Sequence, residues 1–186
     1  MARGVLVSCS AGNDGPYSDS SSNNAPWITT VGAGTLDRDF PAYVSVGNGK
    51  KYRGISLGHG TASLPSGLVP LVYAPNASNS PSGDQCAPNS LIPEMVAGKI
   101  VVCDRGGSRV GKSVVVKKAG GVGMILADTE DYGEELVADA YLLPTAMVGK
   151  KVGDAIKRYI ASHCHIGFRK DIVGYQTLTG GGSIQL

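Results

Sequence analysis

Gly98-Lys99-Ile100-Val101-Val102-Cys103-Asp104-Arg105-Gly106 is the stretch that decides how the larger part of this chain folds. A continuous apolar run of this kind is typical of a strand that is buried on both faces. The sequence therefore predicts a strand over Lys99–Cys103. Apolar residues then recur at helical spacing over Ser113–Ala119, and two glycines follow, so we expect a short helix that ends there.

The segments after this helix continue the pattern. Val122–Ala127 and Leu143–Val148 are predicted as strands, and Val152–Ile160 is predicted as a helix with one apolar face. Strand, helix, strand, strand, helix fits a compact α+β module.

A hairpin is expected ahead of this module. Asn48-Gly49 separates the runs Tyr43–Gly47 and Lys50–Ile55, and Asn-Gly tolerates the positive φ angles of a two-residue hairpin turn. Residues 64–84 are rich in Pro, Ser, Asn and Gly, so we place the start of the module near Pro65.

The N-terminal part predicts a different structure. Val5–Ser8 reads as a buried parallel strand that enters the loop Ser10–Pro16, and Trp27–Val31 reads as the next strand. Within that loop, Asn13 presents an amide that could donate a hydrogen bond to a tetrahedral oxyanion. Such a donor requires a nucleophile and a base, and no convincing Ser/His/Asp set occurs elsewhere in the chain. A turn Asn that bonds its own backbone is the alternative.

Composition narrows the classes of function. The chain has 186 residues, enough for one or two domains, and it is 42% hydrophobic and 17% charged, as in globular proteins. The net charge of +2 without a basic run argues against a nucleic-acid partner. No apolar run reaches the roughly 18 residues of a membrane span, and the first residues do not have the pattern of a signal peptide.

Several blocks in order carry a resemblance to a known family. The sequence resembles a plant subtilisin-like serine protease (subtilase), and its later blocks resemble the protease-associated (PA) domain inserted in that family. The blocks that carry the resemblance are 4–16, 25–33, 36–41, 98–106, 119–126, 134–139, 142–144 and 153–156. The implied fold is α/β: a partial subtilisin-like parallel sheet over 1–64, then an α+β, β-rich PA domain over 65–174. Residues 175–186 are expected to be a divergent, flexible tail.

The resemblance also implies roles. It makes Asn13 the oxyanion-hole residue and places Ser10, Ala11, Gly12 and Pro26 in the walls of the substrate pocket, although simple close packing would also explain such small residues. The family is a secreted endopeptidase of the apoplast or cell wall that acts on peptides or proteins. Its triad would lie outside this chain, so we expect no activity from the chain alone, no cofactor and no metal. The alternative is a non-catalytic PA module that binds a protein or a second copy.

The four cysteines and one sequon complete the implied sites. By resemblance, Cys86 and Cys103 form a disulfide, whereas Cys9 and Cys164 have no evident partner; four reduced thiols are the alternative. Asn76 begins an Asn-Ala-Ser glycosylation sequon, which matters only in the secretory pathway.

Three further patterns favour plain explanations. His59 resembles a catalytic His motif, but it follows Asn13 instead of preceding it, and Pro65 would interrupt the helix that such a His opens, so we expect a loop residue. Asp104-Arg105 is expected to be a surface ion pair or turn. The adjacent residues His163, Cys164 and His165 cannot easily share one tetrahedral metal site.

Overall fold

The computed structural model describes residues 4–15, 17–34, 40–57, 64 and 68–164. The chain divides into two compact units, Met1–Arg38 and Asp39–Leu186. In the described residues, no helix is both long and apolar enough to cross a membrane.

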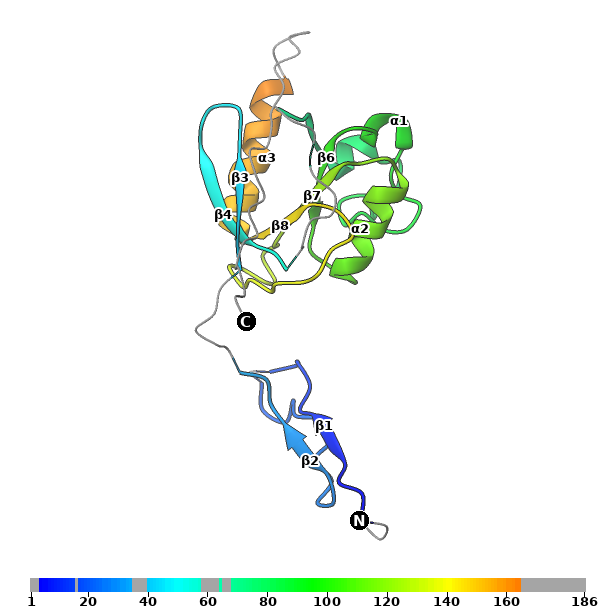
Figure 1. Ribbon diagram of the computed structural model, residues 1–186, viewed down its shortest axis with the longest axis vertical. Coiled ribbons are helices and arrows are strands. Elements are labelled where there is room, and N and C mark those ends of the chain that lie inside the picture. The colour runs from blue at the N-terminus through cyan, green and yellow to red at the C-terminus, as the bar shows by residue number, and fades with distance from the viewer. Residues whose placement is uncertain (1–3, 16, 35–39, 58–63, 65–67, 165–186) are drawn as a thin grey trace, which may run out of the picture. The chain divides into compact units, whose positions relative to one another are not determined.

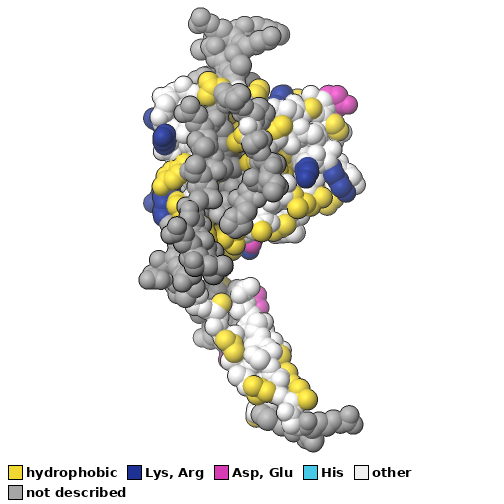
Figure 2. Space-filling model, viewed as in Figure 1, with side chains coloured by type: hydrophobic (Ala, Val, Ile, Leu, Met, Phe, Trp, Pro, Cys, Tyr) yellow, Lys and Arg dark blue, Asp and Glu magenta, His cyan; other side chains and the backbone are white. Residues whose placement is uncertain are grey.

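The first unit contains a two-stranded parallel sheet. Strand β1 (Ser8–Ser10) pairs with β2 (Thr29–Val31), with Ser8 opposite Thr29. The parallel pairing agrees with the sequence, but the expected burial of Val5–Ser8 is wrong, because Val5 and Leu6 are 64% and 67% exposed. Figure 2 shows hydrophobic side chains on the surface of this unit. A sheet of two strands has too few neighbours to bury both faces of either strand.

The second unit is built on a six-stranded mixed sheet in the order β3-β4-β8-β7-β6-β5 (Figure 1). Four strands run parallel, and their bounds are β5 (Leu71–Tyr73), β6 (Ile100–Asp104), β7 (Gly123–Ala127) and β8 (Thr145–Val148). Strands β6, β7 and β8 are fully buried, as their continuous apolar runs predict. The mixed α/β fold agrees with the sequence.

The hairpin extends this sheet at one edge. Strand β3 (Pro41–Ser45) pairs antiparallel with β4 (Lys51–Ile55), and β4 pairs with β8 through Ile55 and Met147. At the turn, the N–H of Gly49 donates to the carbonyl of Val46 over 2.9 Å. The hairpin therefore belongs to the second compact unit, which begins at Asp39. The start of the PA domain near residue 65 stays a prediction. Pairing with β8, far along the chain, joins the hairpin to this unit.

Helices cover both faces of this sheet. Helix α2 (Arg109–Lys118) and the short α1 (Pro93–Val96) pack with Val101, Cys103 and other alternate strand residues in one core. Helix α3 (Lys150–Cys164) packs through Ile156 and Tyr159 on the opposite face, against Ile100 and Val102. Period-two alternation along β6 thus supplies two cores, one on each side of the sheet.

Both main helices are longer than the sequence predicts. Helix α2 starts at Arg109 because the hydroxyl of Ser108 accepts a hydrogen bond from the N–H of Gly111 at 3.1 Å and caps the helix. The expectation of a start at Ser113 followed the apolar residues alone. Strand β5, helix α1 and a 3-10 turn, η1 (Ala74–Ala77), were not expected. They are short and lie among Pro, Ser and Asn residues, where periodicity gives no signal.

Candidate functional site

The loop that carries Asn13 follows β1 directly. The N–H of Ala11 donates to the carbonyl of Val31 over 2.9 Å, which continues the parallel ladder for one residue. The chain then turns at Gly12, whose φ of +89° favours glycine. A Cβ atom at Gly12 would also lie 3.0 Å from the hydroxyl of Ser22. Asn13 therefore follows the carboxyl end of a parallel strand, an edge at which ligands of α/β sheets commonly bind.

Asn13 is exposed, and its side chain makes no hydrogen bond to another described residue. The alternative of a turn Asn that bonds its own backbone is therefore not what the described part of this loop shows. Instead, Asn23 braces the loop, since its Nδ2 donates to the carbonyl of Ser10 over 2.8 Å.

The other residues assigned to the substrate pocket are only partly brought together. Ser10 and Gly12 are exposed and Ala11 is half-buried beside Ser22. The register of the strand pair sets Ser10 opposite Val31 and not opposite Pro26, which is exposed. A role in substrate binding for these four residues stays a prediction.

Two residues of the predicted metal and catalytic patterns, His59 and His165, lie outside the described residues. Cys164 is the last residue of α3. Over the ranges that the structure describes, no three His, Cys, Asp or Glu residues gather in a way that could hold a metal ion.

In the second unit, charged side chains gather where the parallel strands end. Asp104 ends β6, Arg105 follows it, and Asp128 follows β7. Arg105 Nη1 lies 3.1 Å from Asp128 Oδ1 and 2.9 Å from the carboxylate of Glu135. Its guanidinium carbon lies 4.0 Å from the centre of the Tyr132 ring. Arg105 thus joins the end of β6 to the loop that follows β7.

Burial makes this pair unlike a surface ion pair. Arg105 is 8% exposed, and the Asp128 side chain is fully buried. Burial raises the pKa of the Asp128 carboxyl above its usual value, and the hydrogen bond from Arg105 opposes that rise. The expected surface pairing of Asp104 with Arg105 is wrong, because the strand end directs the two side chains to different partners.

Asp104 has its own partners from other elements. Tyr73, the last residue of β5, donates its hydroxyl to Asp104 Oδ2 over 2.7 Å, and Lys157 of α3 lies 2.5 Å from Oδ1. Burial and the hydrogen bond to Asp104 raise the pKa of the Tyr73 hydroxyl. These contacts connect β5, β6 and α3. They include no nucleophile with an adjacent base, so we interpret them as structural.

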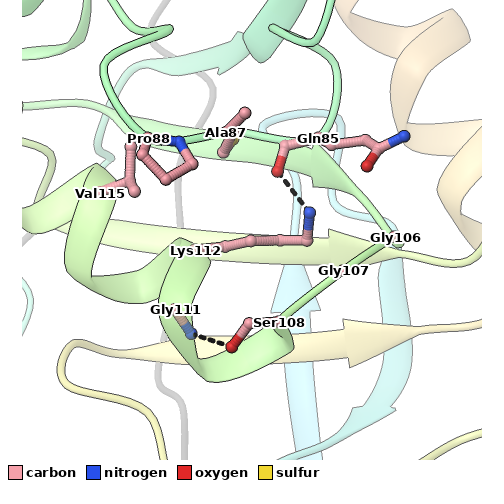
Figure 3. A pocket seen from close by; sticks show the side chains of 10 residues that line it. Gln85, Ala87, Pro88, Gly106, Gly107, Ser108, Gly111, Lys112 and Val115 are labelled. Atoms are coloured by element: carbon pink, nitrogen blue, oxygen red, sulfur yellow. Dashed lines mark hydrogen bonds between the residues drawn. The ribbon is translucent and has the colours of Figure 1, made fainter.

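A pocket lies on the α2 side of the same edge (Figure 3). It has a volume of about 180 Å³ and lies between the segment Gln85–Pro88 and the start of α2. Gly106 lines it with φ +149°, and a Cβ atom there would lie 2.5 Å from Gln85 Oε1. Lys112 extends across the pocket and donates to the carbonyl of Gln85.

A disulfide holds the wall of this pocket. Cys86 and Cys103 are joined, with their Cα atoms 5.7 Å apart, which is the pair that the resemblance implied. Both residues are buried, whereas Cys9 is a free thiol. Asn76, the first residue of the sequon, is exposed in η1 and is accessible to a modifying enzyme.

Comparisons with known proteins show which proteins this chain is similar to. A model of the PA domain matches residues 68–156. Subtilisin-like protease SBT1.7 of Arabidopsis thaliana is 63% identical over 163 residues, which are 87% of this chain and 21% of that protein. Subtilisin-like protease SBT1.6 of the same plant is 52% identical over 178 residues, 93% of this chain and 23% of the relative.

The chain belongs to the plant subtilisin-like protease family. It spans about a fifth of the length of the curated relatives that it matches. Because the PA match covers 68–156, the subtilase segment before it includes the Asn13 loop and the hairpin.

Sequence reasoning missed Lys112 and the pairing of Arg105 with Asp128. A signal existed for both. Asp104 and Asp128 follow neighbouring predicted strands, and parallel strands end at one edge. Lys112 lies four residues before Val116, so helical spacing places it on the buried face of α2.

Proposed function

We propose that this chain is part of a subtilisin-like serine endopeptidase, in which the first unit supplies Asn13 to the oxyanion hole and the second unit is a non-catalytic PA domain. The support is the similarity to proteins named subtilisin-like proteases, which runs through both units. On this proposal, the whole enzyme cleaves peptide bonds of protein substrates outside the cell. A disulfide suits that oxidising compartment.

One observation carries the catalytic part of the proposal. Asn13 is exposed just beyond the end of a parallel strand, and it makes no hydrogen bond within the described chain that would explain it structurally. Its amide can donate to a developing oxyanion without a change of charge. The nucleophile and base would have to come from elsewhere in the intact enzyme.

The test is a chimaera in which this chain replaces the matching segment of the Arabidopsis relative SBT1.7. We expect the chimaera to hydrolyse peptides, because the two segments are 63% identical. Asn13→Ala in it should lower kcat by about 10²–10³-fold, the usual cost of one oxyanion donor, and should change KM little.

Asn24→Ala is the matched control. Asn24 is also exposed and donates to the carbonyl of Ser21 over 2.8 Å, so its loss removes an amide from the same unit without touching the proposed donor. Equal kcat for Asn13→Ala and the parent chimaera would contradict the proposed role.

The second candidate is a binding module, in which the PA unit recognises a protein partner or a second copy. It is favoured by the unit's own two cores and by the pocket beside α2. The chain by itself should then not react with a fluorophosphonate probe. Stoichiometric labelling of one serine in the isolated chain would show an activated catalytic serine within the chain. That result would contradict both the binding module and the proposal that the triad is incomplete here.

A further inference from the structure

A groove of about 410 Å³ continues from the Lys112 pocket along α2. One wall is a single face of the helix, formed by Gly111, Val114, Val115 and Lys118 at positions i, i+3, i+4 and i+7. The other wall is the segment from Pro88 to Pro93. The lining is mostly apolar, and the volume is in the range of sites that bind small ligands and side chains.

The adjoining pocket, which shares Pro88, Gly111 and Val115 with the groove, holds a buried cation without a counter-ion. Lys112 is 5% exposed, and its ammonium donates one hydrogen bond, to the neutral carbonyl of Gln85. Within the described residues, no carboxylate lies within ion-pair distance of it, and Asp84 and Asp104 act on it only from further away. Burial lowers the pKa of Lys112 to about 8, and the more distant carboxylates of Asp84 and Asp104 only partly oppose that fall.

Backbone donors gather at the same end. The N–H groups of residues 106–110 make no hydrogen bond to the described chain, and the first turn of α2 contains no acidic residue. The positive end of the helix dipole therefore also lies there. An anion placed beside Lys112 would meet an ammonium and free N–H donors.

We infer that this groove binds the C-terminal end of a peptide, with its carboxylate beside Lys112 and one or two apolar side chains between Val114, Val115 and Leu91. The buried ammonium at one end and the mostly apolar walls, in which Lys118 is the other basic residue, match a carboxylate attached to an aliphatic residue. Free backbone donors and the side chain of Asn89 can also bind peptide carbonyls, which a fatty acid lacks. This inference does not depend on the proposed protease function.

The test uses the full ¹⁵N-labelled chain and two probes, acetyl-Ala-Leu-Leu with a free carboxylate and the same peptide as its C-terminal amide. We expect the acid to shift the amide resonances of residues 106–118 and to bind at least about tenfold more tightly than the amide, as a charge-assisted hydrogen bond requires. Octanoate, a carboxylate without peptide groups, should bind more weakly than the acid peptide.

Two variants assign the effect to one ammonium. Lys112→Gln should reduce the affinity for the acid to that of the amide. Lys117→Gln should leave the preference unchanged, because Lys117 is exposed on α2 and does not line the groove. The acid and amide are compared first on the parent chain, so the result stands even if Lys112→Gln does not fold.

Four outcomes would overturn the inference: equal binding of acid and amide, no binding below about 1 mM, resonance shifts away from α2, or octanoate that binds as tightly as the acid peptide. Loss of the preference in Lys117→Gln would show that general basic charge, and not the buried Lys112, attracts the carboxylate.

Discussion

Replacing Arg105 by Met should strongly destabilise the second unit. Methionine provides an apolar side chain of similar length, but it leaves the fully buried carboxylate of Asp128 without its cation. Asp128 Oδ2 already has no hydrogen-bond partner in the described structure. The contact between Oδ1 and Arg105 therefore offsets the cost of burying this carboxylate. Removing one partner of such a pair costs about 3–5 kcal/mol. The double variant Arg105→Met with Asp128→Asn should recover a large part of this loss.

The penalty should also depend on pH. Burial already raises the pKa of Asp128 in the folded chain, and loss of Arg105 removes what opposes that rise. A carboxyl whose folded pKa exceeds its unfolded pKa contributes stability at low pH and loses it as pH rises through the folded pKa. The difference in stability between Arg105→Met and the parent should therefore shrink between about pH 7 and about pH 4.

Urea unfolding followed by far-UV circular dichroism measures this difference. The single Trp of the chain, Trp27, lies in the first unit, so its fluorescence reports separately on that part. Arg158→Met is the control, because Arg158 is exposed on α3 and should change stability by less than about 0.5 kcal/mol. A loss below about 1 kcal/mol for Arg105→Met, or one that is constant with pH, would refute the reasoning.

Three further results are expected. The double variant Cys86→Ala with Cys103→Ala should lower the free energy of unfolding by about 3 kcal/mol, the value for a loop near the observed separation of 17 residues, and equal urea midpoints would contradict this. Hydrogen exchange should be faster in residues 4–34 than in 100–160, since a two-stranded sheet protects its amides poorly; uniform protection would be the contrary result. Secretion from a eukaryotic host should attach a glycan at Asn76, and intact mass should show its loss in Asn76→Gln.

The core of the second unit could be predicted well from the sequence. The runs at Lys99–Cys103 and Val122–Ala127 are apolar and each follows a glycine, and they form β6 and β7 within a residue of the expected limits. Short elements such as β5 could not be found in this way, because three residues next to Pro70 have no period to read. Pairing with β6, and not local propensity, makes them a strand.

The sites were less predictable because they depend on contacts across the sheet. Arg105 follows a predicted strand, but its partner Asp128 is 23 residues away on another loop. Nothing in the local sequence distinguishes a buried Arg from an exposed one. Asn13 was found because its loop belongs to blocks that resemble a family, and its exposure in the structure agrees with that role without testing it.

The hairpin β3–β4 has a consequence for the solubility of the PA domain. The PA match begins at residue 68, so a domain cut at that point would lack both strands and would expose the hydrogen-bonding edge of the apolar strand β8. Open edges of this kind pair readily with other chains and lead to aggregation. In the intact unit the outer strand on this side of the sheet is β3. Lys50 follows the hairpin turn and Lys51 begins β4, and lysines near such an edge discourage pairing with a neighbour. The hairpin, which lies outside the matched domain, thus covers the edge of β8 and protects the domain from self-assembly.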